Sequence, residues 1–349
     1  MKMLADEPID LVYTWVDGSD EAFRKSLAKT QSEYSGEAEL SADAIIPSRF
    51  HDLDNLRYSI RSVEQNAPWV NRIFIVTNGQ MPRWLKRSDR VRIVTHQEIF
   101  LNKEFLPTFN STAIELQMHR IPELSRFFLY LNDDMFIARP TSPDYFFGSN
   151  GRPKIFFAPW GLDPAPKTSL LWYHQLAYLV KLLNERFDAQ RNWRQAAHGP
   201  TLFDKDALKD ICAIWKDEIN KTSQKQFRDK EDVLLHPFYT NALAALESES
   251  SGENNCRHEI ETVNDEELLV IPVGDPGAPW RELLTNSLHA PPRFICLNDN
   301  IPAEIADAVD FSEIEKAHKS FLETLFPAPS AHERRLYVLW KKLQNRIRS

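Results

Sequence analysis

Short apolar runs separated by longer helical patterns restrict the fold of this chain more than any other feature. Each run has the length of one strand, and the four clearest occupy residues 9–16, 72–77, 91–95 and 127–131. Continuous apolar runs of this length are typical of parallel strands buried on both faces, and parallel strands need crossover helices between them. We therefore predict an α/β fold, with a central sheet covered by helices on both faces.

The clearest helix follows residue 51. Asp54 stands at its expected N-cap, Leu56, Ile60 and Val63 have the spacing of a buried face, and Pro68 prevents continuation. Its other face carries Arg57 and Arg61. Two arginines one turn apart either grip a phosphate or form surface ion pairs, here with Asp54 and Glu64.

The second half of the chain is richer in helical patterns. Helices are predicted near 170–183, 206–215 and 232–246, and strands near 268–273 and 293–297. The polar stretches 30–47 and 247–267 are predicted to be mobile loops. No linker divides the chain, so we predict one catalytic domain over 1–349. It would comprise an α/β half that binds nucleotide-sugar and metal (1–160), a helical half that completes the site (161–330) and a basic C-terminal helix (331–349).

Composition excludes several classes of protein. No apolar stretch approaches the roughly 18 residues of a membrane span, and acidic residues near the start argue against a signal peptide. The three cysteines are far apart and have no metal-ligand spacing, which favours a reducing, cytoplasmic location. A net charge of −8 argues against nucleic acid as a partner.

Polar residues follow the predicted strand 127–131. Asn132 is succeeded by the pair Asp133 and Asp134, at the strand end where ligands bind in open α/β sheets. Adjacent carboxylates repel, and a hard cation such as Mg²⁺ or Mn²⁺ relieves that repulsion. The alternative is a solvated turn.

Further candidates lie at other turns. Asp17, before Gly18, ends the first strand, and Asn78-Gly79-Gln80 ends the second, so both either face a ligand or form simple turns. His198, between Ala197 and Gly199 in a loop, has a side chain able to accept a hydroxyl proton, although a single histidine is more often structural. Arg228 precedes a helix and is either a phosphate ligand or part of a solvated charge run.

Together these segments resemble the Stealth family of hexose-1-phosphate transferases, which includes bacterial capsule polymerases and the α/β subunit of animal N-acetylglucosamine-1-phosphotransferase. Four blocks match in order. They are IDLVYTWVDG, the stretch 51–136 with LRYSIRSVEQNAPWVNRIFIVTNGQMPRWL and LPTFNSTAIELQMHRIPELSRFFLYLNDDMF, the segment around AHGP at 197–200, and FICLNDN at 294–300. The likeness continues in FLETLFPAPSAHE.

The resemblance implies a glycosyltransferase-A-like, Rossmann-like fold and a UDP-N-acetylhexosamine donor. The sugar and its attached phosphate would pass to an acceptor sugar hydroxyl, with release of UMP. It implies a catalytic role for His198 as base, Arg228 as phosphate clamp and Asp17, and metal binding by Asp133, Asp134 and Asp299 with Mg²⁺ or Mn²⁺. Substrate contacts are expected from Trp15, Gly18, Arg57, Arg61, Asn78, Gly79, Gln80, Asn110, Ser111, His119, Arg120, Asp232 and Asn298.

Two other functions stay open. A conventional metal-dependent glycosyltransferase would use the same donor and release UDP, and a non-catalytic sugar-binding module would keep only the fold. The segment 331–349 combines six basic residues with apolar residues at helical spacing. It either docks on an anionic membrane surface, at the inner face of the membrane, or packs on its own domain.

Overall fold

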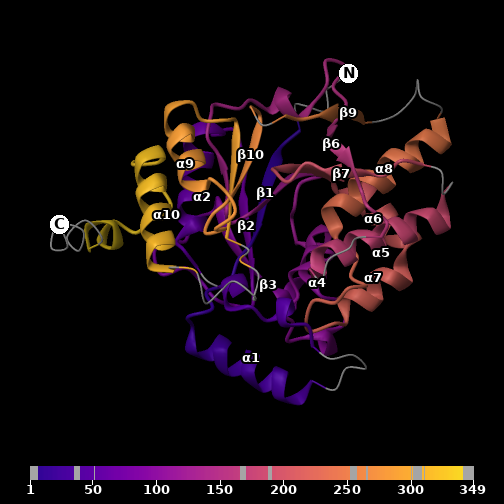
Figure 1. Cartoon of the computed structure of the whole chain (residues 1–349), viewed down its shortest axis with the longest axis horizontal. Coiled ribbons are helices and arrows are strands. Elements are labelled where there is room, and N and C mark those ends of the chain that lie inside the picture. The colour runs from indigo at the N-terminus through magenta and orange to yellow at the C-terminus, as the bar shows by residue number, and fades with distance from the viewer. Residues whose placement is uncertain are drawn as a thin grey trace.

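The structure of the chain, a computed structural model, describes residues 7–34, 40–50, 52–165, 170–187, 191–251, 258–264, 266–299, 301, 309 and 311–340. A five-stranded sheet lies at its centre, in the order β3-β2-β1-β4-β8 (Figure 1). Its strands are β1 (Ile9–Thr14), β2 (Ile73–Thr77), β3 (Val91–Thr95), β4 (Phe127–Asn132) and β8 (Thr201–Asp204). The first four are parallel and β8 is antiparallel to β4. The predicted α/β class and all four predicted strands of the first half are confirmed.

The central strands are buried on both faces, as their apolar runs predict. In β1, Leu11 and Tyr13 pack on one side with the face of helix α2, whereas Val12 packs on the other side with Phe74 and Phe128. None of these five side chains exposes more than about one hundredth of its surface. Burial of apolar area on both faces is the largest favourable term available to such a sheet.

Helices cover both faces of the sheet (Figure 1). On one side lie α2, α9 and α10, and on the other lie α4 to α8. The helices are α1 (Glu21–Glu33), α2 (Asn55–Asn66), α3 (His96–Ile99), α4 (Ser111–Glu115), α5 (Leu171–Arg186), α6 (Lys205–Ile214), α7 (Lys216–Ser223), α8 (Leu235–Ser251), α9 (Trp280–His289) and α10 (Phe311–Leu325). Short 3-10 turns occupy Ala42–Ala44, Pro47–Phe50, Lys103–Phe105, Met118–Arg120 and Pro143–Phe146.

Two smaller sheets extend the structure beyond the central one. One has the order β10-β11-β5 and the other β7-β6-β9. Their strands are β5 (Met135–Ile137), β6 (Lys154–Gly161), β7 (Arg194–Ala196), β9 (Glu259–Thr262), β10 (Leu268–Pro272) and β11 (Phe294–Asn298). The second half therefore carries strands as well as helices, and β8 completes the central sheet from it. One hydrophobic cluster runs from Val12 to Ala245, through both predicted halves; the predicted division at residue 160 stays a prediction.

The predicted loops are wrong in part. Helix α1 extends to Glu33, α8 continues to Ser251, and strand β9 lies inside the second predicted loop. Glu247, on the last turns of α8, pairs with His258 at 2.6 Å between Oε1 and Nδ1. This tertiary contact stabilises a polar stretch that its composition alone assigns to a loop.

Helix α2 anchors the C-terminal part of the chain. Asp54 is its N-cap residue, as predicted, but its side chain makes no capping hydrogen bond and pairs with Arg57 at 2.6 Å. Arg61 donates to both carboxylate oxygens of Glu333, at 2.6 and 2.8 Å, and to the Phe326 carbonyl. Arg57 thus forms the predicted ion pair with Asp54, whereas Arg61 pairs with Glu333 in place of Glu64. Both arginines are buried, and their predicted contact with phosphate stays a prediction.

The described part of the C-terminal segment ends in a helical turn at 335–340. Leu336, Leu339 and Trp340 are 82%, 61% and 51% exposed, so this apolar side does not pack on the domain. Lys341 and the residues after it lie outside the described residues, and membrane docking stays a prediction. Within the described chain, no helix has the length and apolarity needed to cross a bilayer.

Candidate active site

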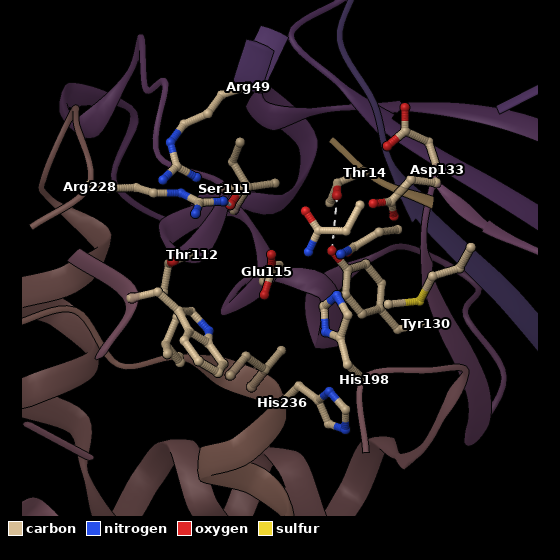
Figure 2. A pocket seen from close by; sticks show the side chains of 18 of the residues that line it. Thr14, Arg49, Ser111, Thr112, Glu115, Tyr130, Asp133, His198, Arg228 and His236 are labelled. Carbon is tan, nitrogen blue, oxygen red and sulfur yellow. Dashed lines mark hydrogen bonds between the residues drawn. The ribbon is translucent and has the colours of Figure 1, made fainter. Parts of the chain in front are cut away.

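A cavity of about 1140 Å³ opens at the carboxyl ends of the parallel strands. Its wall includes Thr14 at the end of β1, Asn78 after β2, His96 after β3 and Asn132 at the end of β4. Parallel strands place their carboxyl ends at one edge of the sheet, and this edge is where ligands bind in open α/β folds. Loops from the second half close the cavity and contribute His198 and Arg228 (Figure 2).

Carboxyl groups gather at one end of the cavity. Asp133 and Asp134 form the turn between β4 and β5, and the Leu297 amide donates to the Asp134 carbonyl at 2.9 Å. That bond joins the turn to the end of β11, so Asp299 reaches the same place. Burial and neighbouring carboxyl groups raise the pKa of Asp133 well above its usual value. Burial raises the pKa of Asp134 to about 6, and burial together with Asp134 raises that of Asp299 to about 7.

Asp52 adds a fourth acid to this end. Its burial, with Asp54 and Asp17 nearby, raises its pKa to about 7, and it acts electrostatically on Asp133. Asp52, Asp133, Asp134 and Asp299 are called the acid cluster below. Among the described residues no lysine or arginine forms an ion pair with Asp133, Asp134 or Asp299. The negative charge that ionisation would build there lacks a paired positive charge in the described part of the chain.

The acid cluster fits a divalent cation in its chemistry. Hard oxygen donors suit Mg²⁺ or Mn²⁺, and the buried Oδ1 atom of Asp134 has no hydrogen-bond partner. Within the described ranges, no three acidic, histidine or cysteine side chains stand close enough to form a ready-made metal site. Mg²⁺ commonly binds through one or two carboxylates together with substrate phosphates, so a complete protein shell is not required.

Two arginines occupy the opposite end of the cavity. Figure 2 shows Arg49 and Arg228 near each other, with Asp133 across the cavity. Arg228 donates a hydrogen bond to the Ser111 hydroxyl, and Arg49 donates to the Asp43 carbonyl. Burial and the charge of Arg228 lower the pKa of Arg49 to about 9. Among the described residues neither guanidinium group hydrogen-bonds a carboxylate, and two such groups held together favour an anion such as a phosphate.

Glu115 lies between the arginines and the sheet. Burial raises its pKa to about 7, although Arg228 and the hydroxyl groups of Tyr130 and Ser111 act to lower it. Tyr130 shares a hydrogen bond with Thr14, at 3.0 Å between their hydroxyl oxygens. Glu115 is therefore close to half protonated near neutral pH, in contact with the group that holds Arg228.

His198 points into the cavity from the loop after β7 (Figure 2). Burial lowers its pKa below the ordinary value of a histidine, so its imidazole is neutral at pH 7 and able to accept a proton. His236, on the first turn of α8, lies beside it and bonds Thr201 Oγ1 through Nε2 at 2.8 Å. Burial and His198 lower the pKa of His236 to about 3.

Comparison with known proteins identifies the family. Models of the four conserved regions of Stealth proteins match residues 7–35, 49–155, 197–239 and 287–336, for regions 1 to 4 in that order. A capsular polysaccharide phosphotransferase of Haemophilus influenzae is 34% identical over 250 residues, which cover 70% of this chain and 67% of that protein. This chain belongs to the Stealth family.

Other relatives are longer. An exopolysaccharide phosphotransferase of Streptomyces coelicolor is 34% identical over 332 residues, covering 94% of this chain and 53% of that protein. The chain thus spans about half the length of this Stealth relative. A crystal structure of the galactosyltransferase LgtC with donor and acceptor sugar analogues covers 93% of this chain and 97% of its own, with a TM-score of 0.44 and 12% identity. A likeness of that degree does not identify a fold, so the glycosyltransferase-A type rests on the sequence resemblance.

All four Stealth regions contribute to the cavity wall. Region 1 supplies Trp15, region 2 Asn78 and the Asp pair, region 3 His198 and Arg228, and region 4 Asp299. The structure thus brings together residues that are about 280 positions apart in the sequence. The predicted site residues that line the wall are Trp15, Asn78, Ser111, Asp133, Asp134, His198, Arg228, Asn298 and Asp299.

Other predicted site residues lie outside the wall, where they support the Stealth loops. The Asp17 carboxylate accepts from the Ser19 amide and hydroxyl, at 2.9 and 2.6 Å. Gln80 bonds the backbone amide and carbonyl of Asp17, both at 2.9 Å. Gly18 packs so closely on Phe50 that a side chain would meet its carbonyl oxygen at 2.4 Å. These residues hold the turn, and the catalytic role predicted for Asp17 and the substrate contacts predicted for Gly18 and Gln80 stay predictions.

Asn110 and Asp232 hold the loop of Arg228. Asn110 caps α4, and its amide donates to Asp232 at 2.8 Å, while both side chains are fully buried. Asp232 also accepts from the Asp229 amide at 2.9 Å. They position Arg228 and are absent from the cavity wall, and their predicted contact with substrate stays a prediction.

Five more residues predicted to contact substrate lie outside the wall, and that contact stays a prediction. His119 is buried away from the cavity, and Arg120 beside it donates to Gln117. Gly79 has a positive φ of 110° and stands in open space at the turn after β2, so its role is in the turn. Arg57 and Arg61 are absent from the wall because α2 turns them toward Glu333.

Sequence reasoning missed Arg49, Asp52, Glu115 and His236, which all lie at this site. Glu115 had a detectable signal, because it follows Ser111 by four residues and so shares one face of a helical turn. His236 had no such signal, since its position depends on how α8 packs against β8.

Proposed function

We propose that this chain transfers N-acetylhexosamine 1-phosphate from a UDP-sugar to an acceptor sugar hydroxyl and releases UMP. The proposal rests on one observation, namely that basic and acidic side chains occupy opposite ends of one cavity. Arg49 and Arg228 lie at one end, the acid cluster lies at the other, and neutral His198 points into the cavity away from the arginines. Relatives that are named capsular and exopolysaccharide phosphotransferases support the same reaction class.

The two ends of the cavity suit the two parts of a sugar diphosphate. The arginines match the negative oxygens of the phosphate that carries the sugar, because a guanidinium group donates two parallel hydrogen bonds to such oxygens. The acid cluster suits a cation bound between the protein and the nucleotide phosphate. Donor and catalyst would then share one desolvated cavity, where charge interactions are stronger than in water.

In the proposed reaction, an acceptor oxygen forms a bond to the sugar-bearing phosphorus while the bond from that phosphorus to the oxygen of UMP breaks. His198 accepts the proton of the acceptor hydroxyl, and UMP leaves with the bonding electron pair on its phosphate oxygen. Arg228 and Arg49 stabilise the charge on the phosphoryl oxygens. Ser111, and through it Glu115, fix the direction of the Arg228 side chain.

Asp133, Asp134 and Asp299 would hold a divalent cation. When bound, Mg²⁺ or Mn²⁺ would neutralise the phosphate of the departing UMP. Asp52 is close enough to raise the effective negative charge of this site.

The experiment that tests the proposal identifies the released nucleotide. Purified protein is incubated with UDP-N-acetylglucosamine, Mg²⁺ and a panel of sugar acceptors, and the products are analysed by mass spectrometry and ³¹P NMR. UMP and a new phosphodiester resonance are expected, and both should be lost in Arg228→Ala. UDP with no phosphorus in the sugar product would identify a conventional glycosyltransferase. Donor binding without release of either nucleotide by any acceptor would favour a sugar-binding module.

We also propose that residues 331–349 contact an anionic membrane surface. Leu336, Leu339 and Trp340 form an exposed apolar side, and basic residues flank it in the sequence. Flotation with anionic and neutral liposomes tests this, comparing the intact chain with a variant in which these three residues are serine. Truncation before residue 331 is unsuitable, because it removes Glu333 from buried Arg61. Equal flotation of both proteins would contradict the proposal.

A further inference from the structure

Two tryptophans with exposed rings stand in the wall of the same cavity. Trp160 is 60% exposed and Trp172 is 37% exposed, and both line it. Tyr173, 41% exposed, contacts Trp172 with ring centroids 5.0 Å apart. Single exposed apolar residues are ordinary, whereas aromatic rings gathered at one cavity mark a binding surface.

An irregularity in β6 turns Trp160 outward. The pairing of β6 with β7 runs from Phe157 opposite Ala196 to Gly161 opposite Arg194, so between these pairs three residues of β6 face one residue of β7. Alternation of buried and exposed residues stops there, and Pro159, Trp160 and Gly161 are all exposed. Bulges of this kind redirect a side chain and are frequent beside active sites.

Trp172 is fixed by the start of α5. The Leu171 amide donates to the Asp43 carboxylate at 3.1 Å, and Leu171 itself is buried. The Asp43 carbonyl oxygen also accepts a hydrogen bond from Arg49. The first turn of α5 is thereby tied to the segment that carries an arginine of the cavity, and Trp172 remains on its exposed side.

The aromatic rings lie next to the element that carries His198. The Ala197 amide donates to the Phe156 carbonyl at 3.0 Å, which continues the β6–β7 pairing to the residue before His198. The cavity wall also includes the uncharged residues Pro159, Leu170, Gln195 and Val263, together with Asp43, whose carboxylate accepts from the Leu171 amide.

We infer that Trp160 and Trp172 form an aromatic platform that binds the acceptor as a saccharide chain. Aromatic faces suit the apolar C–H faces of pyranose rings, and the amide of Gln195 offers hydrogen bonds to hydroxyl groups. The platform lies between residues 155 and 197, which the models of Stealth regions 2 and 3 leave unmatched. The segment that selects the acceptor is therefore separate from the matched Stealth regions, whose residues would bind the donor. This inference rests on the proposed function, because it names the second substrate of that site.

Binding of neutral hexasaccharides tests the platform without requiring turnover. Maltohexaose, cellohexaose and chitohexaose are titrated into the wild-type chain and into Trp160→Ala, Trp172→Ala and Trp160→Phe by isothermal calorimetry. Trp340→Ala is the matched control, since it removes an exposed tryptophan outside the cavity wall. At least one hexasaccharide should bind, with affinity about tenfold weaker in both cavity alanine variants. Trp160→Phe and Trp340→Ala should stay within about threefold of wild type.

Several outcomes would overturn the inference. They are unchanged affinity in both cavity alanine variants, no binding of any of the three hexasaccharides to wild type, and a wild-type dimer that both alanine variants dissociate in light scattering. The last would assign the rings to a contact between copies of the chain. Release of UDP in place of UMP in the nucleotide assay would refute the proposed function alone, because hexasaccharide affinity is measured without donor.

Discussion

At the residue scale, burial determines which groups of the cavity are charged. Arg228 has no carboxylate partner among its hydrogen bonds and bonds only the neutral hydroxyl of Ser111 in the described chain. Its charge is therefore available to a ligand. Burial lowers the pKa of His198 and raises the pKa of Glu115. Both side chains therefore favour the neutral form more than the free side chains do.

Loss of the Arg228 charge should slow turnover strongly. We expect Arg228→Ala to lower kcat by on the order of a hundredfold or more, because one charged donor to a transition-state oxygen is worth about 3 kcal/mol. Arg228→Lys should recover part of the rate, since it restores the positive charge but not the two parallel hydrogen-bond donors of a guanidinium group. Initial rates of UMP release measure this, with thermal melting to verify folding. A folded alanine variant with wild-type kcat would remove Arg228 from the mechanism.

The pH profile distinguishes His198 from Glu115 as the base. Because burial lowers the pKa of His198, the acid limb of kcat/KM should lie below about pH 6.5 if this residue is the base. A limb near 7 would instead match Glu115. His198→Gln should lower kcat/KM about a hundredfold and abolish the limb, whereas Glu115→Gln should keep it. Persistence of the limb in His198→Gln would exclude its role as base.

At the element scale, helix α2 and the C-terminal segment are held together by a buried ion pair. Removal of Glu333 leaves Arg61 buried and unpaired, so Glu333→Ala should reduce the free energy of unfolding by about 3–5 kcal/mol. The control is Glu21→Ala on α1, whose partner Lys25 is 75% exposed, and it should cost less than about 1 kcal/mol. Urea denaturation measures both. Equal small losses would show that the C-terminal segment does not stabilise the sheet.

At the scale of the whole molecule, the acid cluster makes stability depend on pH and on metal. Burial raises the pKa of Asp52 and Asp299 to about 7 from a usual value of 3.8, so the contribution of these two groups to the stability of the metal-free protein is greatest below about pH 4. Stability should then fall as pH rises through 7, when these groups ionise without a counter-charge. A cation that binds the ionised form should restore the loss.

Melting curves test this dependence. In EDTA, Tm should be lower at pH 8 than at pH 5, and Mg²⁺ should raise Tm at pH 8 more than at pH 5. In the double variant Asp133→Asn, Asp134→Asn the response to Mg²⁺ should disappear, since two of the proposed ligands are neutral. An equal response to Mg²⁺ in that variant would place the ion elsewhere.

The helices and strands of this molecule could be predicted from the sequence more fully than the contacts between its side chains. The four central strands, α2, α5, α6 and the strands β10 and β11 follow from periodicity, because a buried strand or helix face leaves a local pattern of apolar residues. The end of α8 did not follow, since the polar residues near Glu247 are stabilised by His258, 11 positions away. Likewise, Arg57 and Arg61 show the same spacing whether they bind phosphate or Glu333.

The sequence by itself determined the α/β class, the strand ends that carry Asp133 and Asn78, and the family. These depend on local periodicity and on residues adjacent in the chain. Only the tertiary structure decided which polar residues face the cavity: Arg49, Glu115 and His236 line it, whereas Arg61, His119 and Asp232 do not. The physical reason is that a polar side chain is satisfied by whichever partner packing brings within hydrogen-bond distance, and that partner lies far away in the sequence.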